Sequence, residues 1–190
     1  MVKKAENARE RFESAAYALF QDHGYAETTV PQIAAKAGLT ERTFYRYFSD
    51  KREVMFWRAD AHRSAIMKEI MNAPVGLHPL DVVAGSFSAI APFIDGHRPI
   101  VKLRQSLISA YVELHERELM KLHNLALAID SGLQQRGIQP SFSRVLAEIG
   151  AAVFKVALQN WRADEAKSGF VHHVQAASRE FQAGLHKVAG

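Results

Sequence analysis

The feature that most constrains the fold is a stretch of 25 residues, 28–52, with the sequence TTVPQIAAKAGLTERTFYRYFSDKR. Thr29 and Gln32 have the spacing of a capping box, which predicts that a short helix begins there. Gly38 suits the left-handed backbone conformation that ends a helix, and Thr40 is a favourable N-cap for a second helix. The stretch therefore predicts two short helices joined by a tight turn, which is a helix-turn-helix.

The second of these helices, residues 41–48, separates its side chains into two faces. At about 100° per residue, Phe44 and Phe48 lie on one side, while Arg42 and Arg46 point away from it. Two guanidinium groups with hydroxyl groups beside them can donate hydrogen bonds to guanine edges or phosphates in a DNA major groove. The alternative is an ordinary solvated face, but that would leave two tyrosine rings exposed without a reason. We therefore predict that this helix contacts DNA.

The same residues resemble the DNA-binding signature of the TetR family of bacterial transcriptional repressors. The resemblance covers residues 12–57 without a gap, in a Thr-initiated helix, an IA..AG turn, a recognition helix of the form T-[FL]-Y-x-Y-F and a following lysine. It implies an all-α fold, with an N-terminal three-helix head and then a helical bundle that binds a small effector and pairs two copies. It also implies that the helix linking head and bundle moves as a lever.

The candidate DNA contacts have two roles. Arg42, Tyr45 and Arg46 are candidates for contact with bases or phosphates, and Arg42 replaces a small residue common in the family motif. Hydroxyl groups and one ammonium group are candidates for holding the DNA backbone: Thr28, Thr29, Thr40, Thr43, Tyr47 and Lys51. Lys51 is expected in the first turn of the linking helix, where its ammonium group and the positive helix end can meet one phosphate.

Apolar periodicity predicts helices along the rest of the chain. The first covers residues 3–23, and Lys3 and Lys4 at its start form either a phosphate-binding arm or a disordered tail. The later ones are expected at residues 51–72, 78–94 with a kink or an end at Pro92, 99–109, 112–136, 141–162 and 168–188, with a loop at 95–97. No Gly or Pro marks the boundary that we place near residues 111–112. We predict a DNA-binding domain at residues 1–50 and an effector-binding and dimerisation domain at residues 51–190.

The helix expected at residues 141–162 has two apolar stripes, so it must be covered on two sides. One stripe contains Val145, Ile149, Ala152, Val153 and Val156, and the other contains Leu146, Gly150, Phe154, Leu158 and Trp161. Together with the last helix, this pattern suggests a four-helix interface between two copies, with these candidates: Leu146, Gly150, Phe154, Leu158, Val174 and Phe181. The alternative is that one subunit buries both stripes in its own core.

The family resemblance also implies an effector cavity in the carboxy-terminal domain. Large apolar side chains that could line it are Trp57, Phe87, Phe93, Leu107, Tyr111, Phe154 and Trp161. The alternative, which the sequence favours for each of them, is ordinary core packing, because periodicity does not separate a lining residue from a packed one. If a cavity exists, this inventory favours a mostly apolar or aromatic effector.

Several functional classes find no support in the sequence. There is no cysteine, so disulfides and thiolate sites are excluded, and no phosphate-binding glycine loop or nucleophile elbow occurs. His115 and Glu116 begin a zinc-protease motif, but Leu119 stands where the second histidine is needed. We therefore expect no enzyme, no metal and no cofactor. The net charge of +4 permits nucleic-acid binding without establishing it.

The sequence also predicts the location and the partners of the protein. No apolar run approaches the length of a membrane span, and the N-terminus does not resemble a signal peptide. We expect a cytoplasmic, homodimeric repressor that binds a palindromic operator in double-stranded DNA, is released by a small-molecule effector and has no membrane partner. The alternative is a helical ligand-binding or protein-interaction module with a non-functional head, and a gel-shift experiment would distinguish the two.

Overall fold

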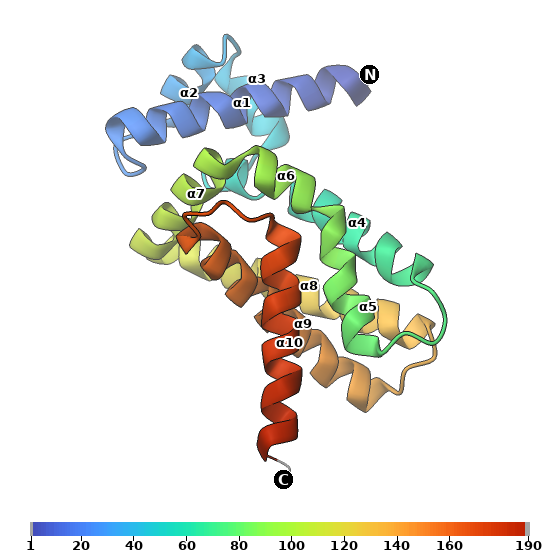
Figure 1. Cartoon of the computed structure of the whole chain (residues 1–190). Helices are drawn as coiled ribbons and strands as arrows, with labels where there is room; N and C mark the ends of the chain where they lie inside the picture. The colour runs from blue at the N-terminus through green and yellow to red at the C-terminus, as the bar shows by residue number, and fades with distance from the viewer. Residues whose placement is uncertain (1, 189–190) are drawn as a thin grey trace. The chain divides into compact units, whose positions relative to one another are not determined.

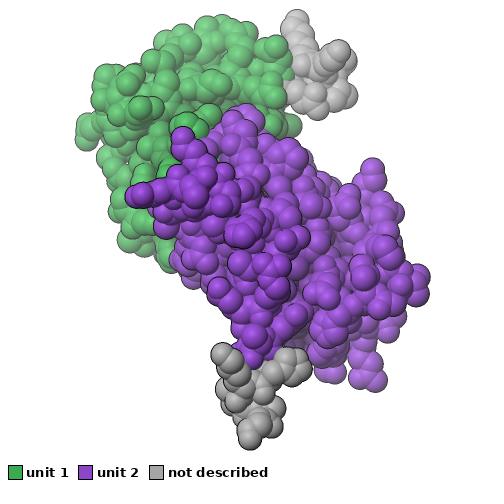
Figure 2. All heavy atoms as spheres, viewed as in Figure 1, with its two compact units in different colours: residues 1–59, 99–115 green, residues 60–98, 116–190 purple. Residues whose placement is uncertain are grey.

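The computed structural model describes residues 2–188, with side chains described for residues 7–185. These residues form helices joined by turns, and no β-strand occurs among them (Figure 1). The all-α prediction is therefore confirmed. The chain divides into two compact units, coloured separately in Figure 2. Unit 1 contains residues 1–59 and 99–115, and unit 2 contains residues 60–98 and 116–190.

Unit 1 begins with the three helices of the head. These are α1 (Val2–His23), α2 (Val30–Lys36) and α3 (Glu41–Tyr47). A short 3₁₀ turn, η1 (Glu53–Met55), follows them, and most of α7 (Arg98–Ala110) and the first residues of α8 (Val112–Gln135) also belong to this unit. The predicted arm of Lys3 and Lys4 lies outside the described side chains.

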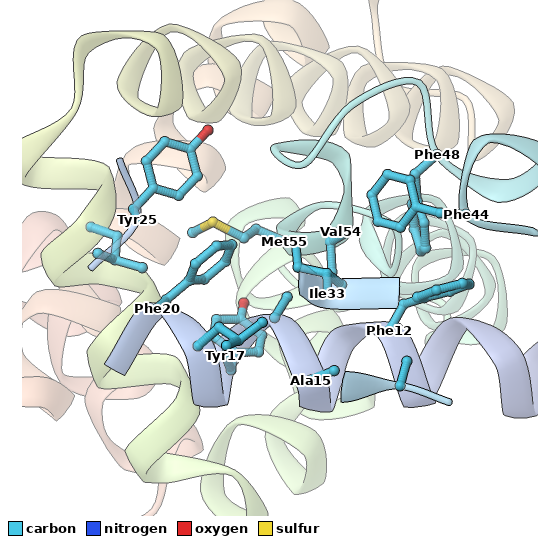
Figure 3. Packing of buried hydrophobic residues seen from close by; sticks show 14 of the residues in the cluster. Phe12, Ala15, Tyr17, Phe20, Tyr25, Ile33, Phe44, Phe48, Val54 and Met55 are labelled. Carbon is cyan, nitrogen blue, oxygen red and sulfur yellow. The ribbon is translucent and has the colours of Figure 1, made fainter. Parts of the chain in front are cut away.

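The core of unit 1 is built around aromatic rings (Figure 3). The ring of Phe12 on α1 lies edge-on to both phenylalanines of α3, with centroid distances of 5.2 Å to Phe44 and 6.0 Å to Phe48. Because α2 and α3 have only seven residues each, the three helices supply little apolar surface, and residues outside them complete this core. These are Val54, Met55 and Phe56 from the segment around η1, and Leu107, Ile108 and Leu114 from α7 and α8.

Unit 2 is a helical bundle. It contains nearly all of α4 (Ala59–Asn72), then α5 (Pro79–Ser86), the 3₁₀ turn η2 (Phe87–Ala89), α6 (Ala91–Gly96), most of α8, α9 (Pro140–Ala163) and α10 (Phe170–Val188). α9 packs against both α5 and α10. At Gly150 a Cβ atom would lie 2.5 Å from Cγ1 of Val83, so the absence of a side chain lets α9 approach α5 closely.

Most helix boundaries agree with the prediction, and three do not. The predicted loop at residues 95–97 is largely helical, because α6 continues to Gly96. The chain divides at Tyr111, as predicted, between α7 and α8. The linking helix, however, begins at Ala59 and not at Lys51, because the buried residues around η1 pack into the head core. The helix predicted over residues 78–94 is broken at η2, and Pro92 lies in the first turn of α6, where its missing N–H leaves no hydrogen bond unmade.

The two compact units also differ from the predicted domains. Residues 51–59 and 99–115 pack with the head, whereas the prediction assigned them to the second domain. The division at residue 50 separated a DNA-binding domain from an effector-binding and dimerisation domain, and this division by function stays a prediction. Among the described residues, no helix combines the length and the apolar character that crossing a membrane requires.

Candidate nucleic-acid interface

The helix-turn-helix is fixed by the local contacts that its sequence predicts. Thr29 caps α2: its hydroxyl accepts a hydrogen bond from the Gln32 amide, while the Gln32 side chain accepts one from the Thr29 amide at 2.8 Å. Gly38 has a φ of 62°, which ends the helix. Thr40 then caps α3 by accepting a hydrogen bond from the Thr43 amide at 3.1 Å. The predicted capping box, turn and N-cap are therefore confirmed.

One side chain from α1 holds the turn, and no sequence pattern predicts this contact. Nη2 of Arg11 donates hydrogen bonds to the carbonyl oxygens of Ala37 at 2.5 Å and Gly38 at 3.2 Å. These oxygens follow the end of α2, where carbonyl groups lack helical partners. Arg11 therefore fastens the turn to α1. No local pattern signals this contact, because 26 residues separate Arg11 from Ala37.

The two faces of α3 are as predicted. Phe44 and Phe48 are buried, with exposed fractions of 0% and 3%. Arg42 and Arg46 are exposed, and the Tyr45 ring is 57% exposed although it is large and apolar. Two guanidinium groups and one phenol group therefore project from a short helix whose opposite face is fixed in the core.

Arg46 has a defined intramolecular contact. Its Nη2 donates a hydrogen bond to the hydroxyl group of Tyr47 at 3.1 Å, and its guanidinium carbon lies 4.8 Å from the centre of the Tyr47 ring. The Tyr47 ring is half-buried and packs against the head core. Because a guanidinium group has five N–H donors, most of those on Arg46 remain available for a ligand.

Thr28 does not occupy the surface position that the sequence analysis assigned to it. Its side chain is 1% exposed, and its hydroxyl donates a hydrogen bond to the carbonyl oxygen of Gly24 at 2.7 Å. This bond holds the loop between α1 and α2. The burial removes Thr28 from the candidate phosphate contacts, while the exposed Thr29 and Thr40 and the half-buried Thr43 remain.

Lys51 is also engaged inside unit 1. Its Nζ donates hydrogen bonds to the carbonyl oxygens of Tyr25, Ala26 and Thr28 at 2.7, 3.2 and 3.0 Å, and it lies 4.3 Å from the centre of the Tyr25 ring. An ammonium group has three donors, so these bonds use all of them. Burial lowers the pKa of Lys51, and the charges of Glu113 and Glu27 oppose this effect. The structure therefore gives Lys51 the role of holding the α1–α2 loop, in place of the predicted phosphate contact.

Comparisons with known proteins agree with this geometry. Residues 14–56 match the family model of the bacterial regulatory proteins, tetR family. Over these residues the chain is similar to the TetR family. A relative, the HTH-type transcriptional regulator TcmR of Streptomyces glaucescens, is 34% identical over 88 residues, which are 46% of this chain and 39% of the relative. The chain thus spans about two-fifths of the length of this curated relative.

Solved structures of other proteins share the fold. Thermus thermophilus FadR, in complex with lauroyl-CoA, superposes with a TM-score of 0.57 at 21% identity, covering 90% of this chain and 91% of FadR. The SmeT–triclosan complex superposes with a TM-score of 0.61 at 18% identity, covering 93% of this chain and 90% of SmeT. At these identities the likeness concerns the fold alone.

The candidate effector residues fall into both units. Trp57, Leu107 and Tyr111 lie in unit 1, and Phe87, Phe93, Phe154 and Trp161 lie in unit 2. Within unit 2, the structure brings Phe87 and Phe154 together at 5.3 Å between ring centroids. Trp161 is fully buried, and its Nε1 donates a hydrogen bond to Oδ1 of Asp95 at 2.8 Å. Phe87, Phe154 and Trp161 are therefore packed as core residues. A role of the seven candidates in an effector pocket stays a prediction.

The candidate dimer residues are placed differently from the prediction. The stripe formed by Leu146, Gly150, Phe154 and Leu158 is buried within the chain, as is Val174 on α10, and Phe181 is half-buried. The other stripe of α9 faces outward except at Val153, which is 5% exposed, while Val145 is 59% and Val156 is 40% exposed. The first set therefore fills the chain's own core, because α5 and α10 cover that side of α9.

Proposed function

We propose that this chain is a DNA-binding transcriptional regulator of the TetR family, a repressor whose α3 helix enters the DNA major groove. The observation that carries the proposal is the outward projection of Arg42, Tyr45 and Arg46 from a helix whose other face is buried in the head core. A guanidinium group can donate two hydrogen bonds to one guanine, and this is the commonest specific contact with that base. A rigid helix aims such groups at fixed positions.

The hydroxyl groups around α3 suit contacts with the DNA backbone. Thr29, Thr40, Thr43 and Tyr47 lie at the start of α2 or along α3 and are exposed or half-buried. Phosphate contacts of this kind fix the register of a protein on DNA but carry no sequence information. In this proposal, the arginines select the sequence and the hydroxyl groups hold the helix in place.

The proposed regulator works as a homodimer on a palindromic operator. The outward stripe of α9, which consists of Val145, Ile149, Ala152 and Val156, is an apolar face that a second copy can cover. A two-fold symmetric dimer presents two α3 helices, so its DNA site should contain two inverted half-sites. A regulator of this kind would act in the bacterial cytoplasm.

A small, mostly apolar effector releases the proposed repressor from DNA. Of two proteins with the same fold, SmeT binds triclosan, which is such a molecule, while FadR binds lauroyl-CoA, in which an apolar acyl chain is joined to a highly charged coenzyme A group. An effector shifts the equilibrium between two conformations by as much as its affinity differs between them. Here the linking helix α4 would transmit the change. A ligand screen that finds thermal stabilisation by highly charged compounds alone would contradict the apolar effector.

Selection from random DNA tests the proposal most directly. The wild-type chain is expected to enrich duplexes with two inverted half-sites whose centres lie about one helical turn, or a multiple of it, apart. A double variant, Arg42→Ala with Arg46→Ala, is the matched control and should enrich no shared sequence. If the wild-type chain enriches nothing above this control, the proposal is wrong.

A further inference from the structure

Five side chains of unit 1 form a continuous series of cation–π contacts. Around the Tyr47 ring, the guanidinium carbon of Arg46 lies 4.8 Å and that of Arg9 lies 5.4 Å from the ring centre. Arg9 also lies 5.9 Å from the centre of the Trp57 ring, and Arg58 lies 4.2 Å from it. Each distance is within the range in which a guanidinium group is attracted to a ring face. The series joins α3 to α1 and to the segment that precedes α4.

Ring contacts are the interactions that hold Arg9. Its Nε atom is buried and has no hydrogen-bond partner among the described residues, and the same is true of Nε1 of Trp57. The next member of the series is fixed more firmly, because Arg58 donates hydrogen bonds to Oε2 of Glu13 from Nε at 3.0 Å and from Nη2 at 2.8 Å. Trp57 and its neighbour therefore form an anchored support against which Arg9 packs.

The other end of the series is the end of the DNA-facing helix. Tyr47 is the last residue of α3, and Phe48 after it is extended, with φ −136° and ψ 135°. A helix of seven residues is too short to be stable by itself and depends on tertiary contacts. Arg46, the proposed DNA contact in its last turn, rests on Tyr47. Any contact that holds Tyr47 therefore also determines where the guanidinium group of Arg46 points.

We propose that Arg9 is a positioning residue for DNA recognition, which stacks on Trp57 and Tyr47 and thereby holds the end of α3 with Arg46 in the DNA-binding pose. The inference rests on the proposed function, since it assigns a role in the same site. Pre-ordering Arg46 lowers the conformational entropy that DNA binding would otherwise cost. Arg9 thus acts through Tyr47 and need not touch the DNA.

Replacement of Arg9 by lysine separates this role from a direct phosphate contact. Lysine keeps the charge but lacks the planar guanidinium group that stacks on rings. With one duplex selected by the wild-type chain as probe, we expect both Arg9→Lys and Arg9→Gln to weaken binding by about fivefold to thirtyfold, the range that corresponds to the loss of one or two cation–π contacts. The control is Arg63→Gln, which removes a positive charge from an ion pair with Asp60 on α4 and should leave binding unchanged.

A double-mutant cycle separates positioning from a general loss of structure. Tyr47→Leu removes the ring on which Arg9 acts, so Arg9→Lys should cost less than about twofold in that background. Binding is measured at a temperature at which every variant retains its full helical circular dichroism, so that unfolding does not contribute. A coupling seen in DNA affinity under these conditions would not arise from a merely structural role.

The outcomes are distinct. The inference is overturned if Arg9→Lys binds DNA as tightly as the wild type does, or if the effects of Arg9→Lys and Tyr47→Leu on DNA affinity are additive. It is also overturned if Arg9→Gln lowers the slope of log affinity against log salt by about one while Arg9→Lys leaves that slope unchanged, because this result would indicate a direct phosphate contact. Each of these results leaves the proposed function intact. If the wild-type chain selects no duplex at all, the proposed function is overturned and this inference with it.

Discussion

At the scale of single residues, Lys51 shows how a side chain that looks suited to a ligand can serve the fold. Its ammonium group donates to three carbonyl oxygens of the α1–α2 loop, and these oxygens belong to residues 23 to 26 positions earlier in the chain. Spacing and charge on the sequence do not reveal such a contact, because it depends on where the loop lies after folding. The buried hydroxyl of Thr28 was misjudged for the same reason.

Replacement of Lys51 by methionine should therefore lower stability more than it changes DNA binding. Hydrogen bonds from a charged donor contribute roughly 1.5–3 kcal/mol each, and we expect a loss of about that size for the partly exposed group as a whole. Urea denaturation measures it. The matched control is Lys36→Met, which breaks a 3.7 Å surface ion pair with Asp22 and should cost about 1 kcal/mol or less. A salt dependence of DNA binding lowered by about one unit, with stability unchanged, would instead restore the phosphate contact.

Arg42 is the residue at which a direct test of base recognition is clearest. Its side chain is exposed at the start of α3. If it contacts a guanine, Arg42→Ala should weaken operator binding by about 1–3 kcal/mol and relax the preference at one base pair in each half-site. Affinities for operators with single base substitutions measure this. An equal loss for every sequence would assign Arg42 to a phosphate, and an unchanged footprint would remove it from the interface.

At the scale of elements, the sequence predicts helices well where caps and turns are local. The capping box of α2, the positive φ of Gly38 and the N-cap of α3 each depend on residues within four positions of one another. The predicted start of the linking helix at Lys51 was wrong because helix-like apolar spacing continues through residues 54–61. Three consecutive residues there, Val54, Met55 and Phe56, are all buried, and burial of three neighbours requires core on several sides. Periodicity along one helix face does not predict that arrangement.

The loop between α9 and α10 carries a pH-dependent contribution to stability. Asp164 accepts hydrogen bonds from the amides of Ser168 at 2.7 Å and Ala166 at 2.9 Å, and its Oδ2 lies 3.1 Å from Nε2 of His173. Burial by itself raises the pKa of Asp164, but hydrogen bonds from Ser168, His173 and Ala166 outweigh it and lower the pKa to about 2. Since the unfolded value is about 3.9, the contribution is present above about pH 4 and is lost as the pH falls through about 2.

The variant Asp164→Asn should therefore be less stable than the wild type at neutral pH and should lose less stability between about pH 4 and pH 2. Urea denaturation at a series of pH values measures the difference. Asp60→Asn is the control, because that carboxylate is highly exposed in a surface ion pair with Arg63. Equal pH profiles for Asp164→Asn and the wild type would show that these hydrogen bonds do not stabilise the loop.

At the scale of the whole molecule, the two apolar stripes of α9 show where sequence reasoning ends. Both stripes have helical spacing, and nothing in their composition indicates which one the chain covers by itself. In the structure, the chain covers the stripe that contains Gly150, because α5 approaches that side so closely that there is no room for a Cβ atom at Gly150 beside Val83. The remaining face, with Val145 and Val156 exposed, is the one available to another molecule. Most of the candidate dimer residues chosen from the sequence belong to the stripe that the chain covers by itself.

This assignment predicts opposite effects for two neighbouring residues. Val145→Glu places a charge on the outward stripe, so the proposed dimer should dissociate while the fold stays stable, since surface substitutions usually change stability by about 0.5 kcal/mol or less. Leu146→Ala opens a cavity in the chain's own core and should cost about 2–5 kcal/mol without changing the mode of association. Sedimentation gives the oligomeric state, and urea denaturation gives the stability.

DNA binding by the Val145→Glu chain then completes the test. If the two heads act together only through this face, the variant should lose affinity for a duplex with two half-sites but bind a duplex with a single half-site as the wild type does. A variant that stays dimeric, with unchanged affinity for the symmetric duplex, would mean that the copies pair through another surface. The exposed stripe of α9 would then need a different partner, and the symmetry expected of the operator would have to be derived from that other surface.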